Sequence, residues 1–212
     1  MSKKGVFITF EGGEGSGKST QSRLLANRLV LDGFDVVLTR EPGGTDGAER
    51  IRDLVLTGSA DKWGALTEAL LYLAARSDHW ERVIKPAIDA GKVVISDRFH
   101  DSSIIYQGHV KGVPTDFLDF VYKIITGGVV PDRTYLIVTD PQIGLQRSIN
   151  NHNNKETRFE QMGVEFHRLV LNNFLKLAKQ NDRFAVIDGS RSISSIQNDI
   201  LMDFGQIFVE IV

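Results

Sequence analysis

The sequence of 212 residues contains no cysteine, which excludes disulfides, thiolate catalysis and zinc sites built from cysteine. It also lacks a basic excess, because 25 lysines and arginines are set against 27 aspartates and glutamates, a formal charge of −2. A protein that binds nucleic acid nonspecifically needs such an excess, so we expect no nucleic-acid partner. No apolar run approaches the roughly 18 residues of a membrane span, and we therefore expect no membrane partner.

The length and the hydrophobic content of 42% suit one well-cored domain. Because no repeat and no long linker marks a boundary, we predict a single domain that spans residues 1–212. Two positive charges, Lys3 and Lys4, are followed directly by an apolar run that leads into the main motif of the chain. A cleavable leader there would remove that motif, so we expect a cytoplasmic protein.

That motif is the run Gly-Gly-Glu-Gly-Ser-Gly-Lys-Ser at residues 12–19, which fits the phosphate-binding pattern GxxxxGK[ST]. An apolar run before it predicts a strand, and leucines at helical spacing after it predict a helix. Glycines let the backbone approach a phosphate, and amides at a helix start attract negative charge. Lys18 is expected to reach the β- and γ-phosphates, and the Ser19 hydroxyl to bind Mg²⁺. The loop residues expected to bind ATP are Gly12, Gly13, Glu14, Gly15, Ser16, Gly17, Lys18, Ser19 and Thr20.

Apolar runs that alternate with helical patterns predict an α/β fold, a five-stranded, mostly parallel sheet flanked by helices. Asp97 ends the third apolar run, where the second acidic element of a phosphate-loop protein helps to hold Mg²⁺. The expected strands are residues 6–10, 36–39, 93–97, 135–139 and 184–187. The expected helices are residues 20–31, 48–56, 66–90 with a break at Pro86, 101–106, 114–125, 141–149, 160–179 and 193–207.

Three kinds of phosphate-loop protein compete. A GTPase-type switch would need an Asn-Lys-x-Asp motif, which is absent, although residues 153–156 come near it. A motor or DNA-handling ATPase would bring extra domains or a basic face. A small-molecule kinase needs a second anion site, and it is favoured because several arginines follow elements that reach the same crevice. These are Arg40, Arg50, Arg52, Arg76 and Arg98.

Beyond the phosphate loop, the chain resembles the bacterial thymidylate kinases over nearly its whole length. The loop alone would be unspecific, but the further segments in this order are highly specific. The matching segments are residues 10–19 around the loop, 39–45 (Thr-Arg-Glu-Pro-Gly-Gly-Thr), 74–76 (Ala-Ala-Arg), 97–99 (Asp-Arg-Phe), 106–108 (Tyr-Gln-Gly), 131–132 (Pro-Asp) and 157–160 (Thr-Arg-Phe-Glu).

The resemblance implies a phosphate-loop nucleoside-monophosphate-kinase fold with a lid loop at about residues 147–160. It implies ATP-dependent phosphorylation of dTMP to dTDP for dTTP synthesis, with ATP and Mg²⁺ as cofactors and a homodimer packed through helices. Two alternatives stay open. One is another nucleoside-monophosphate or deoxynucleoside kinase, and the other is a phosphate-loop NTPase that binds nucleotide as a switch or a partner-binding module.

The family's residue roles carry over to positions that match. Arg98 and Arg52 would bind the acceptor phosphate, because a guanidinium fork matches two phosphate oxygens; a solvated helix arginine is the alternative for Arg52. Glu14 matches an acid that contacts the 3′-hydroxyl of dTMP. The residues expected to act in catalysis are Lys18, Asp97, Arg98 and Arg158.

The thymine edge would be read by Arg76, Ser103 and Gln107, whose amide offers both a donor and an acceptor. Tyr72, one helical turn before Arg76, would stack on the base, with plain helix packing as the alternative. Tyr106 would pack against the sugar, at a position where a 2′-hydroxyl could be excluded. A core aromatic is the equal alternative for Tyr106.

The most polar stretch, residues 150–158, is predicted to be a mobile lid, and here the chain departs from the family. Members whose phosphate loop lacks an arginine place several in the lid, but residues 150–156 offer only His152 and Lys155. Arg158 matches the retained family arginine and is expected to contact the γ-phosphate. Arg147 is expected to lie against adenine.

Overall fold

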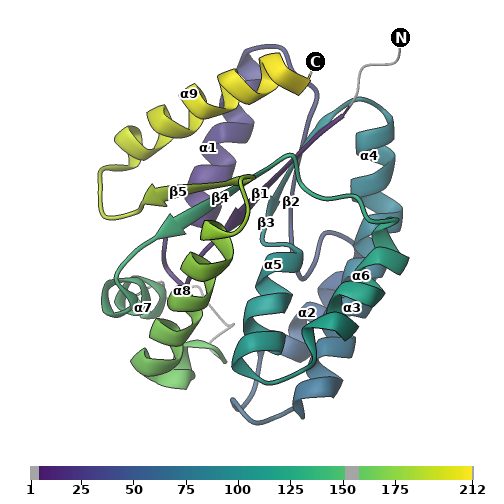
Figure 1. Ribbon diagram of the computed structural model, residues 1–212, viewed down its shortest axis with the longest axis vertical. Helices are drawn as coiled ribbons and strands as arrows, with labels where there is room; N and C mark the ends of the chain where they lie inside the picture. The colour runs from purple at the N-terminus through teal and green to yellow at the C-terminus, as the bar shows by residue number, and fades with distance from the viewer. Residues whose placement is uncertain (1–4, 151–157, 212) are drawn as a thin grey trace.

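A parallel five-stranded sheet in the order β2-β3-β1-β4-β5 forms the centre of the molecule (Figure 1). The structure is a computed structural model that describes residues 5–150 and 158–211. Each predicted strand is present, with ends that differ by no more than two residues. The strands are β1 (Val6–Glu11), β2 (Val36–Arg40), β3 (Val93–Asp97), β4 (Arg133–Val138) and β5 (Phe184–Asp188).

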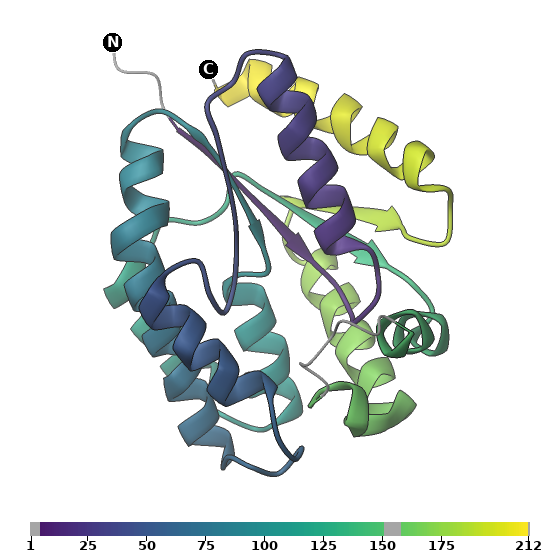
Figure 2. The same cartoon turned by 180° about the vertical axis from the view of Figure 1, so that it is seen from behind.

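Helices cover both faces of the sheet, as the alternating pattern predicted (Figures 1 and 2). The α-helices are α1 (Lys18–Leu31), α2 (Asp46–Leu56), α3 (Ala65–His79), α4 (Lys85–Asp89), α5 (His100–Ser103), α6 (Thr115–Thr126), α7 (Pro141–Ile149), α8 (Gly163–Lys179) and α9 (Ile193–Ile211). Two segments with wider π-helical turns continue α3 and α5, namely η1 (Trp80–Ile84) and η2 (Ile104–Val110), and a 3₁₀ turn, η3 (Glu160–Met162), precedes α8.

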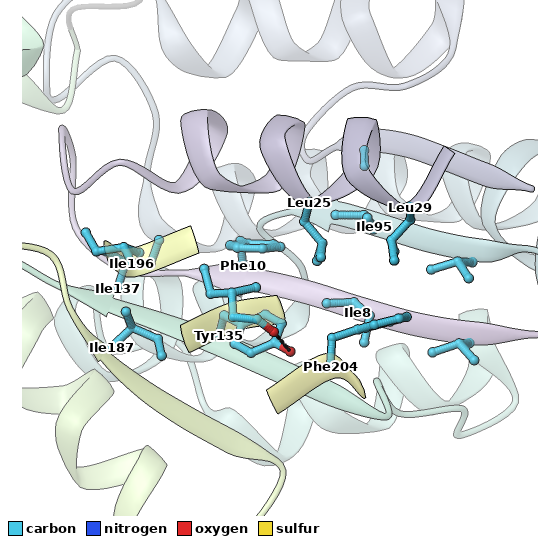
Figure 3. Close-up of a cluster of buried hydrophobic side chains, with 14 residues drawn as sticks. Ile8, Phe10, Leu25, Leu29, Ile95, Tyr135, Ile137, Ile187, Ile196 and Phe204 are labelled. Carbon is cyan, nitrogen blue, oxygen red and sulfur yellow. Dashed lines mark hydrogen bonds between the residues drawn. The ribbon is translucent and has the colours of Figure 1, made fainter. Parts of the chain in front are cut away.

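Alternation along β1 divides the core between the two faces of the sheet. Ile8 and Phe10 point toward α1 and α9, where they pack with Leu25 and Phe204 (Figure 3). Phe7 points the opposite way and packs against the cluster around η1 and α4. Because both faces are buried, β1 is apolar nearly throughout and ends in a buried carboxylate.

The predicted helix over residues 66–90 is present, but it is not one regular helix. It is built of α3, η1 and α4, and Pro86 lies in the first turn of α4. Proline has no amide hydrogen to donate, so a change of helical geometry just before it is the physical consequence. The helix predicted over residues 160–179 likewise begins as η3 and changes at Gly163, which has a φ of 78°.

The central strand β1 has β3 on one side and β4 on the other. In open α/β sheets, ligands bind at the carboxyl ends of the strands where the strand order reverses. The loops after β1, β3 and β4 therefore frame the place where a site is expected. Of the helices in the described residues, none is both long enough and apolar enough to cross a membrane.

Candidate active site

The loop between β1 and α1 has the conformation that its sequence predicted. Gly17 takes a left-handed conformation with a φ of 103° immediately before α1 begins at Lys18. The Lys18 ammonium turns back over the loop and donates to the carbonyl oxygen of Gly13 at 2.6 Å. Burial, followed by the nearby Arg98 charge, lowers the pKa of Lys18 to about 8.

Two oxygen ligands of the kind that Mg²⁺ prefers meet beside the loop. The Ser19 hydroxyl, at the start of α1, donates a hydrogen bond to Asp97 Oδ2 at the end of β3. The register of the sheet explains the contact, because Asp97 is level with Phe10, just before the loop. Hydroxyl and carboxylate oxygens suit a hard cation such as Mg²⁺.

A large open pocket surrounds the phosphate loop. Its lining includes loop residues 14–20, Asp97 and Arg147, which were predicted to bind ATP or Mg²⁺, whereas Gly12 and Gly13 are not among the residues that line it. It also includes Gly189 and Arg191, which the sequence analysis did not select. Both follow the carboxyl end of β5, so the position of that strand was the available signal.

Helix α7 touches the phosphate loop backbone to backbone, and a pair of glycines makes this possible. A Cβ on Gly144 would lie 2.5 Å from the Glu14 carbonyl oxygen, and one on Gly15 would lie 2.0 Å from the Gly144 carbonyl oxygen. Gly144 was also missed, although glycine inside a predicted helix is costly and indicates a packing role. The contact places the α7 turn that carries Arg147 at the pocket.

Arg98 stands at the corner after β3 and faces the phosphate loop. It is the one described residue other than glycine with a positive φ, 69°. Its guanidinium donates to Glu14 at 2.7 Å and to the Gly12 carbonyl oxygen at 3.0 Å. Burial would raise the pKa of Glu14, but the charges of Arg98 and Lys18 hold it below its usual value. Glu14 is therefore a carboxylate paired with Arg98.

Glu11, the last residue of β1, stabilises the corner after β3 through hydrogen bonds. Its buried carboxylate accepts hydrogen bonds from the Phe99 amide at 2.9 Å and from the Ser102 hydroxyl at 2.6 Å. Ser102 in turn accepts a hydrogen bond from Arg98 at 3.0 Å. Burial, helped by Asp101, raises the pKa of Glu11 to about 7. Glu11 was not predicted from the sequence as a site residue. It holds Arg98 in place indirectly, through Ser102.

A second, smaller pocket adjoins the first and shares lining residues with it. All of the residues predicted to bind the acceptor line it: Glu14, Arg52, Tyr72, Arg76, Arg98, Ser103, Tyr106 and Gln107. Glu41, Phe159 and Glu160 also line it and were not selected. Arg76 is held by Glu41 at 2.7 Å and donates to the Ser103 hydroxyl at 3.0 Å, so buried partners fix its position.

The candidate arginines differ in position. Arg52 and Arg98 line both pockets, at the border between them. Arg76 lines the smaller pocket, and Arg40 lines the larger one while pairing with Glu49 at 3.0 Å. Among the described residues that line either pocket, Arg50 does not appear, and its side chain is exposed.

Arg158 is not placed where it was predicted. It is not among the residues that line the larger pocket, and its side chain is 1% exposed. It pairs with the buried Glu68 at 2.5 Å and donates to three backbone carbonyl oxygens, that of Val55 in α2 and those of Ser59 and Ala60 in the connection to α3. A charge buried away from water must be compensated by an opposite charge and hydrogen bonds, and the contacts of the Arg158 guanidinium provide both. In this structure Arg158 therefore has a structural role, and its contact with the γ-phosphate stays a prediction. Residues 151–157 of the predicted lid lie outside the described residues.

The fold and these two pockets define a class of protein: a phosphate-loop enzyme that holds a nucleotide beside a second, arginine-bordered ligand. Comparison with known proteins narrows the class. The thymidylate kinase family model matches residues 10–200. A thymidylate kinase from Ruegeria pomeroyi is 50% identical and covers 94% of each chain. One from Caulobacter vibrioides is 44% identical, over 91% of this chain and 92% of the relative.

A solved structure that resembles this chain comes from the same family as these relatives. The crystal structure of thymidylate kinase from Ehrlichia chaffeensis has a TM-score of 0.75 and 34% identity, and covers 95% of this chain and 99% of that one. The chain belongs to the thymidylate kinase family. The predicted family, fold and enzyme class are confirmed.

Proposed function

We propose that the two adjoining pockets transfer the γ-phosphoryl group of Mg²⁺-ATP to dTMP, with the acceptor phosphate lying at their border. The reaction follows from the family: the chain is a kinase that phosphorylates dTMP to dTDP with ATP. The observation that carries the site assignment is that Arg52 and Arg98 line both pockets. Two guanidinium groups there would face the acceptor phosphate and the group in transfer together.

The donor side would be served by the phosphate loop and Asp97. Lys18 and the loop amides would bind the phosphates of ATP, with Arg147 on the adenine side. Ser19 and Asp97 would hold Mg²⁺, which supplies positive charge to the phosphates when it is bound. Among the described residues, no group of three or more acids and histidines could hold a metal alone. Phosphate oxygens would therefore complete the ligand set, as is usual for Mg²⁺.

On the acceptor side, Arg98 and Arg52 would bind the phosphate of dTMP. Arg52 donates to the Pro42 carbonyl oxygen at 2.6 Å, a contact that steers its guanidinium along the border of the pockets. Glu14 would accept a hydrogen bond from the 3′-hydroxyl of the sugar, and the Tyr106 hydroxyl, which donates to Glu14 at 3.4 Å, would wall the sugar.

The base would lie deeper in the smaller pocket. Tyr72 would stack on it, while Arg76, Ser103 and Gln107 would meet its edge. Burial raises the pKa of Tyr72, which therefore acts as a neutral ring. Because Arg76 and Gln107 are buried and hydrogen-bonded to protein groups, their polar atoms meet the base from fixed positions.

We also propose a cytoplasmic homodimer of single-domain subunits, packed through α3 and α6. These two helices pack side by side, and each exposes large apolar side chains, which together we call the α3/α6 surface (Figure 1). Phe120 and Ile124 of α6 are 63% and 67% exposed, and Leu66 and Leu70 of α3 are 54% and 48% exposed. A surface of this kind marks an interaction site, and the family resemblance favours a second copy as its occupant.

ADP release with Mg²⁺-ATP and dTMP, dUMP, dCMP or dGMP in turn tests the proposal. We expect dTMP to raise turnover far above the rate with ATP alone, with dCMP and dGMP near that background. If none of the four raises turnover, the proposal fails. If dCMP equals dTMP, the roles of Arg76 and Gln107 at the base edge are wrong.

A further inference from the structure

Glu68 is a buried carboxylate that lines neither pocket among the described residues, yet it contacts a residue that lines one of them. It lies in α3 and is 0% exposed. Three donors from two segments converge on it: Arg158 at 2.5 Å, and, from η2 and its C-terminal cap, Gln107 at 2.9 Å and Lys111 at 2.7 Å. Two cations around one carboxylate make this a paired and saturated buried charge.

The contact with Gln107 is the informative one. Gln107 lines the acceptor pocket, is 2% exposed, and donates from its amide nitrogen to Glu68 Oε1. An ionised carboxylate can only accept, so the end of the Gln107 amide that faces Glu68 must be the NH₂ group. If the amide flipped, its oxygen would face a carboxylate oxygen in a dry interior, which costs both a hydrogen bond and a repulsion.

The Gln107 amide then offers its oxygen as an acceptor on the other side of the group, and the Arg76 guanidinium, which lines the same pocket, offers donors. Thymine presents an N3–H donor next to its O4 acceptor, which complements this pair. Cytosine presents an N3 acceptor next to an N4 amino donor, which opposes both groups. A site built to pair with one edge rejects the other because its own buried groups are left unpaired.

We propose that Glu68 is a positioning residue that fixes the orientation of the Gln107 amide, and thereby selects a pyrimidine protonated at N3 against cytosine. The proposal rests on the proposed role of Gln107 at the base edge. It assigns a determinant of base choice to a side chain that never touches the base.

The test is Glu68→Gln, because a glutamine at this position offers a donor as well as an acceptor and allows the Gln107 amide to flip. The readout is the ratio of kcat/KM for dTMP to kcat/KM for dCMP. Both values come from one preparation, so the fraction of folded enzyme cancels. We expect the ratio to fall about tenfold or more, the scale of one lost base-edge hydrogen-bond pair.

The matched control is Lys111→Met, which removes another partner of Glu68 but leaves the bond to Gln107. We expect this variant to keep the ratio within about twofold, even if its stability falls. Gln107→Leu should lower the ratio itself, and adding Glu68→Gln to Gln107→Leu should change it no further.

The outcomes distinguish a failure of the role of Glu68 from a failure of the role of Gln107. If Gln107→Leu lowers the ratio and Glu68→Gln leaves it unchanged, the positioning role of Glu68 is overturned. The same follows if Lys111→Met lowers the ratio as much as Glu68→Gln does. If Gln107→Leu leaves the ratio unchanged, the proposed role of Gln107 fails, and the inference fails with it.

Discussion

Lys18 shows how burial sets the chemistry of a single residue. A lysine in a phosphate loop must be charged to attract phosphate, yet the folded chain buries it next to Arg98. Both effects favour the neutral amine. A bound nucleotide would restore the balance, because phosphate charge favours the ammonium form. The free enzyme should therefore bind ATP with a pH dependence that the complex does not share.

We expect kcat/KM for ATP to fall as the pH rises through about 8, the pKa of Lys18 in the free enzyme. Below that pH the side chain carries its charge; above it the charge is lost before ATP binds. Steady-state kinetics between about pH 6.5 and pH 9.5 measures this. Lys18→Arg, which stays charged, should lack the fall whatever its absolute activity. A flat profile for the unmodified chain contradicts the prediction.

Arg158 gives a prediction about stability rather than rate. Arg158→Ala leaves Glu68 short of a cation and three backbone carbonyl oxygens short of a donor. Breaking a buried pair in this way costs about 3–5 kcal/mol, which for a chain of this size lowers Tm on the order of 10 °C. Thermal unfolding followed by circular dichroism measures it.

The matched control for this prediction is Arg168→Ala, which removes the exposed Arg168–Glu165 pair of α8. Exposed pairs contribute little, so Tm should change by no more than about 2 °C. If Arg158→Ala keeps Tm and loses kcat alone, the buried pair is not the role of Arg158, and the original lid assignment regains its support.

At the scale of elements, α7 and the phosphate loop act as one unit because Gly15 and Gly144 let their backbones touch. In Gly144→Ala, the new methyl would lie 2.5 Å from the Glu14 carbonyl oxygen, so the loop or the helix must move. We expect ATP to bind about tenfold more weakly, because phosphate binding needs the loop amides in place. Titration calorimetry with a non-hydrolysable ATP analogue measures the affinity.

Gly205→Ala in α9 is the matched control, since a Cβ there meets nothing within 4 Å. Alanine should be neutral or slightly stabilising at that position and should leave ATP affinity unchanged. If Gly144→Ala binds the analogue as tightly as Gly205→Ala does, the contact between loop and helix has no role in nucleotide binding.

The elements also show what a sequence can and cannot predict. The strands could be predicted because each is a short apolar run bounded by turns, and the acid that ends β3, Asp97, is the proposed ligand of Mg²⁺. The acceptor residues were assigned by family resemblance, and the structure brings them to one pocket. Arg158 could not be placed, because its partner Glu68 lies on a distant helix and no local pattern records that pair. The break predicted at Pro86 is present as the change of helical geometry at η1, although its extent over Trp80–Ile84 was not predicted.

At the scale of the whole molecule, the α3/α6 surface leads to a prediction about assembly. Ile124→Glu places a charge in the middle of the exposed apolar patch on α6. If a second copy covers this patch, burying the charge opposes association, and the variant should sediment as a monomer while the unmodified chain sediments as a dimer. Ile149→Glu, at an exposed apolar position on α7, is the control and should stay dimeric. A monomeric unmodified chain, or a dimeric Ile124→Glu, contradicts the proposed interface.

The central claim is that the two pockets divide the reaction, one for the nucleotide donor and one for dTMP. Tyr72 lines only the smaller pocket and Arg147 only the larger, so each reports on one ligand. Titration calorimetry of dTMP and of a non-hydrolysable ATP analogue against Tyr72→Ala and Arg147→Ala therefore tests the claim directly. We expect Tyr72→Ala to weaken dTMP about tenfold, the scale of a lost base stack, and to leave the analogue unchanged. Arg147→Ala should do the reverse; if either variant weakens the other's ligand instead, the assignment of the pockets is wrong.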